Sequence, residues 1–260
     1  MADKLTGNYG PEQAIPKALD CARTNVWFIE NGHLYSTYKV ARFAGYDEQD
    51  ALVLAYFSQY PDIDEEFNAV NQFGKVFSGK RRFVVKVLHS LHGGNADEIR
   101  QRRTKLRSLI KHHVSKGEFW KAGVLIHSLG DSYAHTKGKF GSSNEKAYGP
   151  VFGHGIPSAL DKITGINLDP DDLDRKVVRE KYVAYINDLF EILNHGNSDQ
   201  SGFDEFVNNI NVDQCADKMC PTFQVLDKDN EALVDRFIKC MNKSLKSLDE
   251  DEMKQLYEDI

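Results

Sequence analysis

The chain has 260 residues, of which 41% are hydrophobic and 28% are charged, and its formal net charge is −6. This composition excludes a fully disordered chain, and the length is sufficient to bury a core without structural disulfides or metals. The sequence has no run of about 20 apolar residues, which excludes a transmembrane helix, and its start lacks the pattern of a Sec-type signal peptide. We therefore expect one domain over residues 1–260 in a soluble protein, either cytoplasmic or exported without such a signal.

Apolar residues recur at helical spacing along most of the chain. We expect helices over residues 11–27, 34–45, 47–60, 96–116, 118–136, 175–193 and 231–248, with Pro61 ending the third. Only residues 82–88 alternate as a strand would. Residues 138–155 and 196–220 are predicted loops, the second containing one short helix, and residues 248–260 form a short helix or a frayed tail. The sequence thus predicts an all-α protein of seven to nine helices.

The four cysteines are few and widely spaced. They do not make a disulfide framework, and free thiols or one local bridge between Cys215 and Cys220 are favoured over metal binding. Cys21 and Cys240 lie far from that pair in the sequence.

Charge is unevenly distributed. Residues 75–116 contain twelve lysines and arginines and only two acidic residues, a net charge of +10, so the remaining chain carries −16. Such a segment is typical either of a surface for phosphate, anionic lipid or nucleic acid, or of a solvated helical face.

The strongest motif lies in the helix predicted over residues 118–136. His127, Asp131 and His135 are four residues apart, so on a helix they form one stripe spanning about 80°. Imidazole and carboxylate groups are the usual ligands of zinc and related ions, and the central aspartate could bridge two metals. The alternative is a set of buried, hydrogen-bonded polar groups, each costing roughly 1–3 kcal/mol if unpaired. The small neighbour Gly130 leaves room for another element to pack closely.

Further residues of ligand type are scattered along the chain, and each taken alone is equally typical of a helix cap or a turn. They are His33, Asp62, His89, His92, His154 and Asp161. We interpret His112, His113 and His195 as solvent-facing or capping residues.

Taken in order, these residues resemble a known family. They are His33, the sequence Ser-Gln-Tyr-Pro-Asp ending at Asp62, the segment around His89, the His-x3-Asp-x3-His-Thr sequence from His127, and His154 with Asp161. This order resembles the zinc-dependent phospholipase C / P1 nuclease superfamily, in its bacterial, poorly characterised branch. The resemblance covers about residues 30–165, and its central helix motif is the specific part.

The resemblance implies an all-helical fold holding up to three zinc ions in a cleft. It implies a first site of Asp62, His89, His127 and Asp131, a second at His33 with Asp131 bridging, and a third at His135, His154 and Asp161. Family members also use an N-terminal tryptophan as a ligand, which Met1 and Trp27 do not reproduce, and Ser158 stands where their last ligand would be. We therefore expect two metals, or a third site completed by Asp161. The choice between His89 and His92 is open.

The resemblance further implies a metal-dependent phosphodiester hydrolase, most like a phospholipase C, using two or three zinc ions or other divalent metals. Asp62 would orient or deprotonate the attacking water, and Asp131 would bridge metals. Arg102, Arg103 and Arg107 would attract the substrate phosphate.

Other functions stay open. A nuclease is less favoured, because an acidic protein has little nonspecific affinity for nucleic acid. A non-catalytic, metal-stabilised helical interaction module and a delivered bacterial toxin with the same chemistry are further alternatives. The aromatic residues Phe140, Tyr148 and Phe152 could contact a membrane surface peripherally or pack as core.

Overall fold

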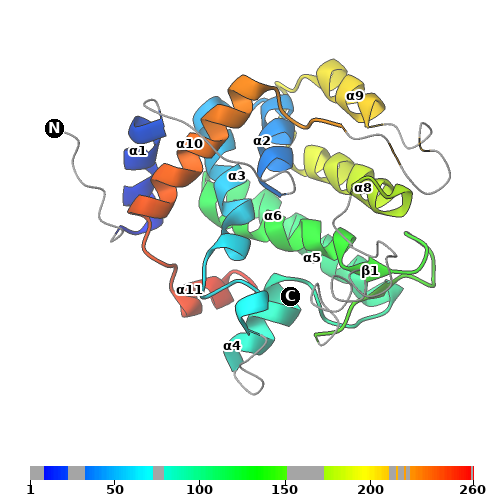
Figure 1. Ribbon diagram of the computed structural model, residues 1–260. Helices are drawn as coiled ribbons and strands as arrows, with labels where there is room; N and C mark the ends of the chain where they lie inside the picture. Colours follow the sequence, from blue (N-terminus) through cyan, green and yellow to red (C-terminus); the bar gives the residue numbers. More distant parts are fainter. Residues whose placement is uncertain are drawn as a thin grey trace.

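The computed structural model describes residues 9–22, 33–72, 79–150, 173–210, 215, 220, 223–258 and 260. This part of the chain is mostly helical, which confirms the all-α prediction, although it holds ten α-helices where we expected seven to nine (Figure 1). The α-helices are α1 (Pro11–Ala22), α2 (His33–Phe43), α3 (Glu48–Ile63), α4 (Gly79–Arg82), α5 (Ala96–Ser115), α6 (Phe119–Ala134), α8 (Lys176–Leu193), α9 (Gln200–Asn209), α10 (Lys228–Ser244) and α11 (Glu250–Gln255). A 3-10 helix, η1 (Val70–Gln72), and a π-helix, η2 (Phe83–Leu88), complete the helical segments.

Short polar side chains fix where five of these helices begin. The Asp47 carboxylate accepts a hydrogen bond from the backbone N–H of Asp50 at the start of α3. Asn95 and Glu98 form a reciprocal capping box at the start of α5. Such caps satisfy backbone donors that have no partner within the helix, which stabilises each start by about 1 kcal/mol. The sequence therefore locates these starts to within a residue or two.

Helix α6 is the centre of the fold, and α3, α5 and α8 pack around it (Figure 1). Every residue from Ala122 to Tyr133 is buried. At Gly123, a Cβ atom would lie 2.6 Å from Cβ of Phe57 and 2.8 Å from the carbonyl oxygen of Leu54. Only glycine therefore allows α3 and α6 to approach this closely.

Helix α3 extends beyond the expected stop at Pro61 and ends at Ile63. A proline in the last turn removes one backbone donor, and the next turn still closes because the N–H of Asp64 donates to the carbonyl of Tyr60. As a result Asp62 lies inside the final helical turn rather than in a loop.

Residues 82–88, the only run that alternates as a strand would, contain no strand, because Phe83–Leu88 forms the π-helix η2. The buried side chains are Phe83, Val84, Val85 and Leu88, a spacing that suits the wider π turn. Phe83 packs edge-on against Tyr257, with ring centroids 5.7 Å apart. Packing against the C-terminal segment thus overrides the local alternation.

The structure also bears on the predicted loops, the short helices and the membrane-spanning potential of the chain. Two short antiparallel strands adjoin the loop predicted over residues 138–155. β1 (Thr136–Lys137) lies just before this loop, and β2 (Lys146–Ala147) lies within it. The predicted short helix within residues 196–220 is α9, and the C-terminal segment contains α11. No helix in the described ranges combines the length and apolar character needed to cross a membrane.

The cysteines favour one of the two alternatives. Cys215 and Cys220 form a disulfide, which confirms the local bridge, and Cys240 is also disulfide-bonded. No described cysteine is a free thiol.

Candidate metal centre

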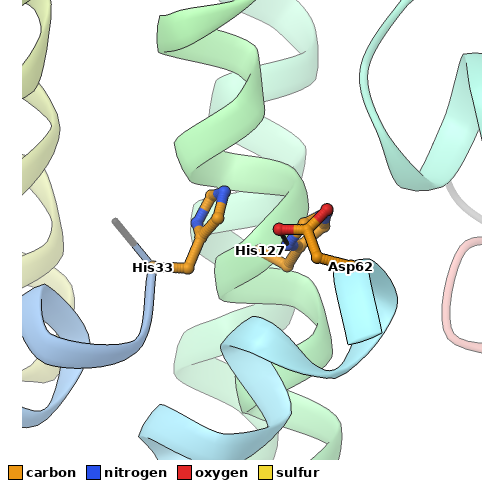
Figure 2. Close-up of side chains that lie close together, drawn as sticks. All are labelled: His33, Asp62 and His127. Atoms are coloured by element: carbon orange, nitrogen blue, oxygen red, sulfur yellow. Dashed lines mark ion pairs between the residues drawn. The ribbon is translucent and has the colours of Figure 1, made fainter. Parts of the chain in front are cut away.

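Separate elements bring six of the predicted ligands together around the middle of α6. His33 is the first residue of α2, Asp62 lies in the last turn of α3, and His89 follows η2. His127, Asp131 and His135 lie along α6 and at its C-terminal end. Figure 2 shows His33, Asp62 and His127 approaching one another from three different helices.

The carboxylate of Asp131 is the hub of the cluster. Its Oδ1 lies 3.0 Å from Nε2 of His33. Its Oδ2 lies 3.1 Å from Nδ1 of His89 and 3.2 Å from Nε2 of His127. Nδ1 of His135 is 3.6 Å from the same oxygen. The two oxygens thus face different histidines, which is the arrangement of a bridging carboxylate.

Asp62 borders the same space from the solvent side. Its carboxylate oxygens lie 3.8 Å from Nδ1 of His89 and 4.0 Å from Nδ1 of His127. The side chain of Asp62 is 37% exposed, against 5% for Asp131 and 2% for His89. Nε2 of Gln59 donates a hydrogen bond to Asp62 and holds its orientation. Among the described candidate ligands, Asp62 is therefore the one that solvent reaches most easily.

Backbone carbonyls fix the protonation of three imidazoles. Nδ1 of His127 lies 2.9 Å from the carbonyl oxygen of Ser58, and Nε2 of His89 lies 2.9 Å from that of Phe67. A carbonyl oxygen only accepts, so each of these nitrogens carries the hydrogen. Nδ1 of His135 is held in the same way by the carbonyl of His89. Carbonyl partners of this kind orient metal-binding histidines in proteins.

The remaining nitrogens of two histidines then face each other. Nε2 of His127 and Nδ1 of His89 lie 3.1 Å apart, and both lie beside Oδ2 of Asp131. Two unprotonated nitrogens and a carboxylate present only lone pairs to one another, and two imidazolium ions would place two hydrogens in the same gap. A single proton shared among these two nitrogens and the carboxylate oxygen leaves at least one pair of lone pairs facing each other. A divalent cation would satisfy all of it, because tetrahedral zinc ligands lie roughly 3.3 Å from one another.

The buried groups of the cluster also shift one another's pKa values. Burial by itself would raise the pKa of Asp131, but the charges of His135 and His127 and the hydrogen bonds with His127 and His33 hold it well below its usual range. Burial would lower the pKa of His89, but the hydrogen bond and charge of Asp131 outweigh it and raise the pKa. Nδ1 of His33 is buried and has no hydrogen-bond partner among the described residues, and its Nε2, beside Oδ1 of Asp131, is the nitrogen that faces the cluster.

The backbone around His89 is specialised. The π-helix η2 ends with the N–H of His89 donating to the carbonyl of Val84. The next residue, Ser90, has a φ of 54°, in the left-handed region that non-glycine residues rarely adopt. Its hydroxyl donates to the carbonyl of Ser128 on α6 and so anchors this turn. Rare backbone geometry of this kind concentrates at functional sites.

The geometry distinguishes the two histidines that the sequence left open. His89 lies in the cluster, whereas Nδ1 of His92 accepts a hydrogen bond from the N–H of Gly94. His154 and Asp161, expected to complete a third metal site, lie outside the described residues. The structure therefore brings together the residues assigned to the first and second metal sites, with His135 beside them.

The three arginines predicted to attract phosphate are engaged by the protein itself. Arg102 donates to the carbonyl of Val87, and Arg103 is buried, paired with the buried Glu145 at 2.8 Å. Arg107 pairs with two carboxylates, Asp188 and Glu191. Their role in substrate binding stays a prediction, but each guanidinium also has a structural role in joining α5 to its neighbours.

A histidine at the end of α5 and the aromatic residues of the loop after α6 were also singled out in the sequence. His113 pairs with Glu118 at 2.8 Å near the end of α5. Phe140 lies partly buried against Tyr133, with ring centroids 5.8 Å apart, so it packs onto the core. Phe152 lies outside the described residues.

Sequence reasoning missed the supporting groups of the site. The carbonyls of Ser58 and Phe67 have no sequence signal, because any residue supplies a carbonyl. Gln59 stands three positions before Asp62, a helical spacing that would have predicted their contact. Gly130 was expected to permit close packing, and the imidazole of His33 lies against it.

Comparison with known proteins gives no further guidance. The chain matches no protein-family model, no curated protein and no solved structure. Its functional interpretation therefore depends on the chemistry of the cluster.

Proposed function

We propose that the protein is a metal-dependent phosphodiester hydrolase, most like a phospholipase C, with zinc or another divalent metal held by the cluster around Asp131. The observation that carries this proposal is the pair of inward nitrogens on His127 and His89, which lie 3.1 Å apart beside one carboxylate oxygen. Carbonyl partners on their outer nitrogens leave these inner nitrogens as ligands. A cation between them removes the conflict of lone pairs.

The residues fit two metals sharing one carboxylate. One set is His89, His127 and Oδ2 of Asp131, and the other includes His33 with Oδ1 of Asp131. Paired divalent ions supply a hydroxide nucleophile near neutral pH and neutralise charge on a phosphoryl group. In this site Asp62, the most exposed of the carboxylates, would orient the attacking water and take its proton.

A non-catalytic metal site is the second candidate, and one observation favours it. His127 and His89 are almost completely buried, and Asp131 is 5% exposed, as in a closed structural site. Structural zinc has four protein ligands, whereas catalytic zinc keeps one position open. The exposure of Asp62 favours the open site, so activity measurements separate the two.

The test combines metal analysis with activity. Purified protein should contain about two or more divalent ions per chain and hydrolyse bis-p-nitrophenyl phosphate. Asp131→Ala should lose metal and reduce turnover by roughly two orders of magnitude or more, because it removes both charge and bridging geometry. Asp251→Ala, at a carboxylate 88% exposed on α11, is the matched control and should behave as wild type.

Three outcomes would be informative. Metal bound without turnover on any phosphodiester would favour the structural site. Turnover of phospholipid vesicles but not of single-stranded DNA or RNA would favour the phospholipase over the nuclease. Protein that binds no divalent metal after dialysis against zinc would contradict the proposal outright.

The disulfides bear on where this chemistry would operate. Disulfides form and persist in oxidising compartments and are rare in the cytosol. The bridges at Cys215–Cys220 and at Cys240 therefore support the exported alternative. Thiol alkylation of protein isolated without reductant should label no cysteine, and full labelling would contradict this placement.

A further inference from the structure

A second pocket lies at the other end of the helical bundle from the metal cluster. Its volume is about 640 Å³, within the range of small-molecule sites. It forms where α2, α5 and α8 end and where α3 and α6 begin. Asp50 at the start of α3 lines it, whereas Asp62 at the end of α3 borders the metal cluster. Twelve residues of helix separate the two sites by roughly 18 Å.

Aromatic rings form one wall of this pocket. The ring of Tyr46 meets Phe119 edge-on, with centroids 5.7 Å apart and an interplanar angle of 89°. On its other side the ring of His195 lies 4.6 Å away. Val114 and Ile192 add apolar surface. The wall suits an apolar ligand body, and its ring faces attract a cation.

One polar group in this wall lacks a partner. Tyr46 is 5% exposed, and its buried hydroxyl makes no hydrogen bond with any described residue. Leaving a buried hydroxyl unpaired costs roughly 1–3 kcal/mol, and such groups are rare in native proteins. A ligand that hydrogen-bonds to this hydroxyl would remove the cost.

Two negatively charged residues line the same pocket. Asp47 and Asp50 line the pocket, and neither forms an ion pair within the described part of the chain. Burial and then the charge of Asp50 raise the pKa of Tyr46 to about 12, and both residues line the pocket. Burial and the charge of Asp47 raise the pKa of Asp50 as well. The two carboxylates repel each other when both are charged, and the hydroxyl has no hydrogen-bond partner. A bound cation that donates hydrogen bonds would stabilise all three groups.

The other charged residues that line the pocket do not alter its preference for a cationic ligand. Glu191 is paired at 2.7 Å with Arg107, which also pairs with Asp188, so Glu191 does not offset the charge of Asp47 and Asp50. Lys111 and Asp47 are both exposed, so water screens both of their charges, and the less exposed Asp50 carries the preference. An anionic ligand would meet two carboxylates, and a neutral ligand would leave them unpaired.

We propose that this pocket binds an organic amine, with the protonated nitrogen between Asp50 and the Tyr46 hydroxyl and the apolar body against Phe119. The ammonium donates to the carboxylate and to the phenol oxygen, and the rings cover the adjoining methylene groups. This site is separate from the metal cluster, and the amine class follows from the pocket alone. It would exist whether or not the cluster is a hydrolase.

The test measures binding of defined probes to the full chain by calorimetry at mildly alkaline pH. Phenethylamine and hexylamine should bind, 2-phenylethanol should bind at least roughly tenfold more weakly, and phenylacetate should not bind. Asp50→Asn should weaken phenethylamine binding by roughly ten- to a hundredfold, because it removes a charge-assisted hydrogen bond. The same affinities are expected with and without bound metal.

A second variant separates binding from folding. Tyr46→Phe removes only the hydroxyl, so the melting temperature should stay equal or rise while the amine affinity falls severalfold. Asp204→Asn, on the exposed part of α9, is the matched control and should bind as wild type. Equal binding of phenethylamine and 2-phenylethanol, unchanged affinity in Asp50→Asn, or no amine binding at millimolar concentration would each overturn the proposal.

Discussion

The imidazole of His33 lies directly against the backbone of Gly130. A Cβ atom built on Gly130 would be 2.7 Å from Cε1 and 2.9 Å from Nδ1 of that ring. His33 comes from the start of α2 and Gly130 from the middle of α6, and the missing side chain allows the ring to reach Asp131. This close approach is a structural requirement of the cluster.

Gly130→Ala should therefore displace His33 and weaken metal binding. Alanine favours helices over glycine by about 1 kcal/mol, so this change should not unfold α6 by itself. We expect loss of the metal held by His33, measured as metal content per chain. In a His33→Ala background the second change should have little further effect on metal content, and an additive effect would show that the contact is unimportant.

Metal removal should destabilise the protein. Without a cation, the inner nitrogens of His89 and His127 must share protons beside a buried carboxylate, which costs free energy. Ligands that bind only the folded state raise its stability, so chelated wild type should melt several degrees below the zinc-loaded protein. In Asp131→Ala the two melting curves should coincide, and an equal metal-dependent shift in that variant would contradict the proposed ligand set.

Arg103 should be more important for folding than for catalysis. Its guanidinium pairs with Glu145, which is 1% exposed, and lies 3.9 Å over the ring of Tyr133. Removing one partner of a buried ion pair leaves an uncompensated charge and costs about 3–5 kcal/mol. Arg103→Gln should show this loss in urea unfolding. A variant of unchanged stability but reduced phosphodiester turnover would instead support the predicted phosphate-binding role.

His92 should make stability depend on pH. Burial, followed by the charge of Arg102, lowers the pKa of His92 to about 4 in the folded state, against about 6.5 in an unfolded chain. The unfolded state therefore binds more protons in this range, and the free energy of unfolding falls as the pH decreases from about 6.5 to about 4.

The matched variant for that prediction is His92→Gln, whose amide can still accept from the N–H of Gly94. Measured on chelated protein, so that metal release does not contribute, it should lose less stability than wild type across the same pH range. Parallel pH profiles for the two proteins would show that His92 does not titrate in this way.

Sequence patterns were reliable where local chemistry decides the structure. The capping residues Asp47 and Asn95 begin their helices because their side chains satisfy backbone donors nearby. The stripe of His127, Asp131 and His135 needed only the helical period to place all three side chains together. Pattern alone failed over residues 82–88, where a short alternating run suits a strand and a π-helix equally well.

The sequence by itself determined a mostly helical protein whose central helix carries His127, Asp131 and His135 along one stripe, because periodicity and capping act over a few neighbouring residues. Only the tertiary structure decided that His89 rather than His92 joins the cluster, that Asp131 divides its oxygens between His33 and the other histidines, and that a pocket of about 640 Å³ lies at the far end. These arrangements join residues dozens of positions apart. Their geometry is set by how whole helices pack against one another, and the spacing of residues within one helix does not predict that packing.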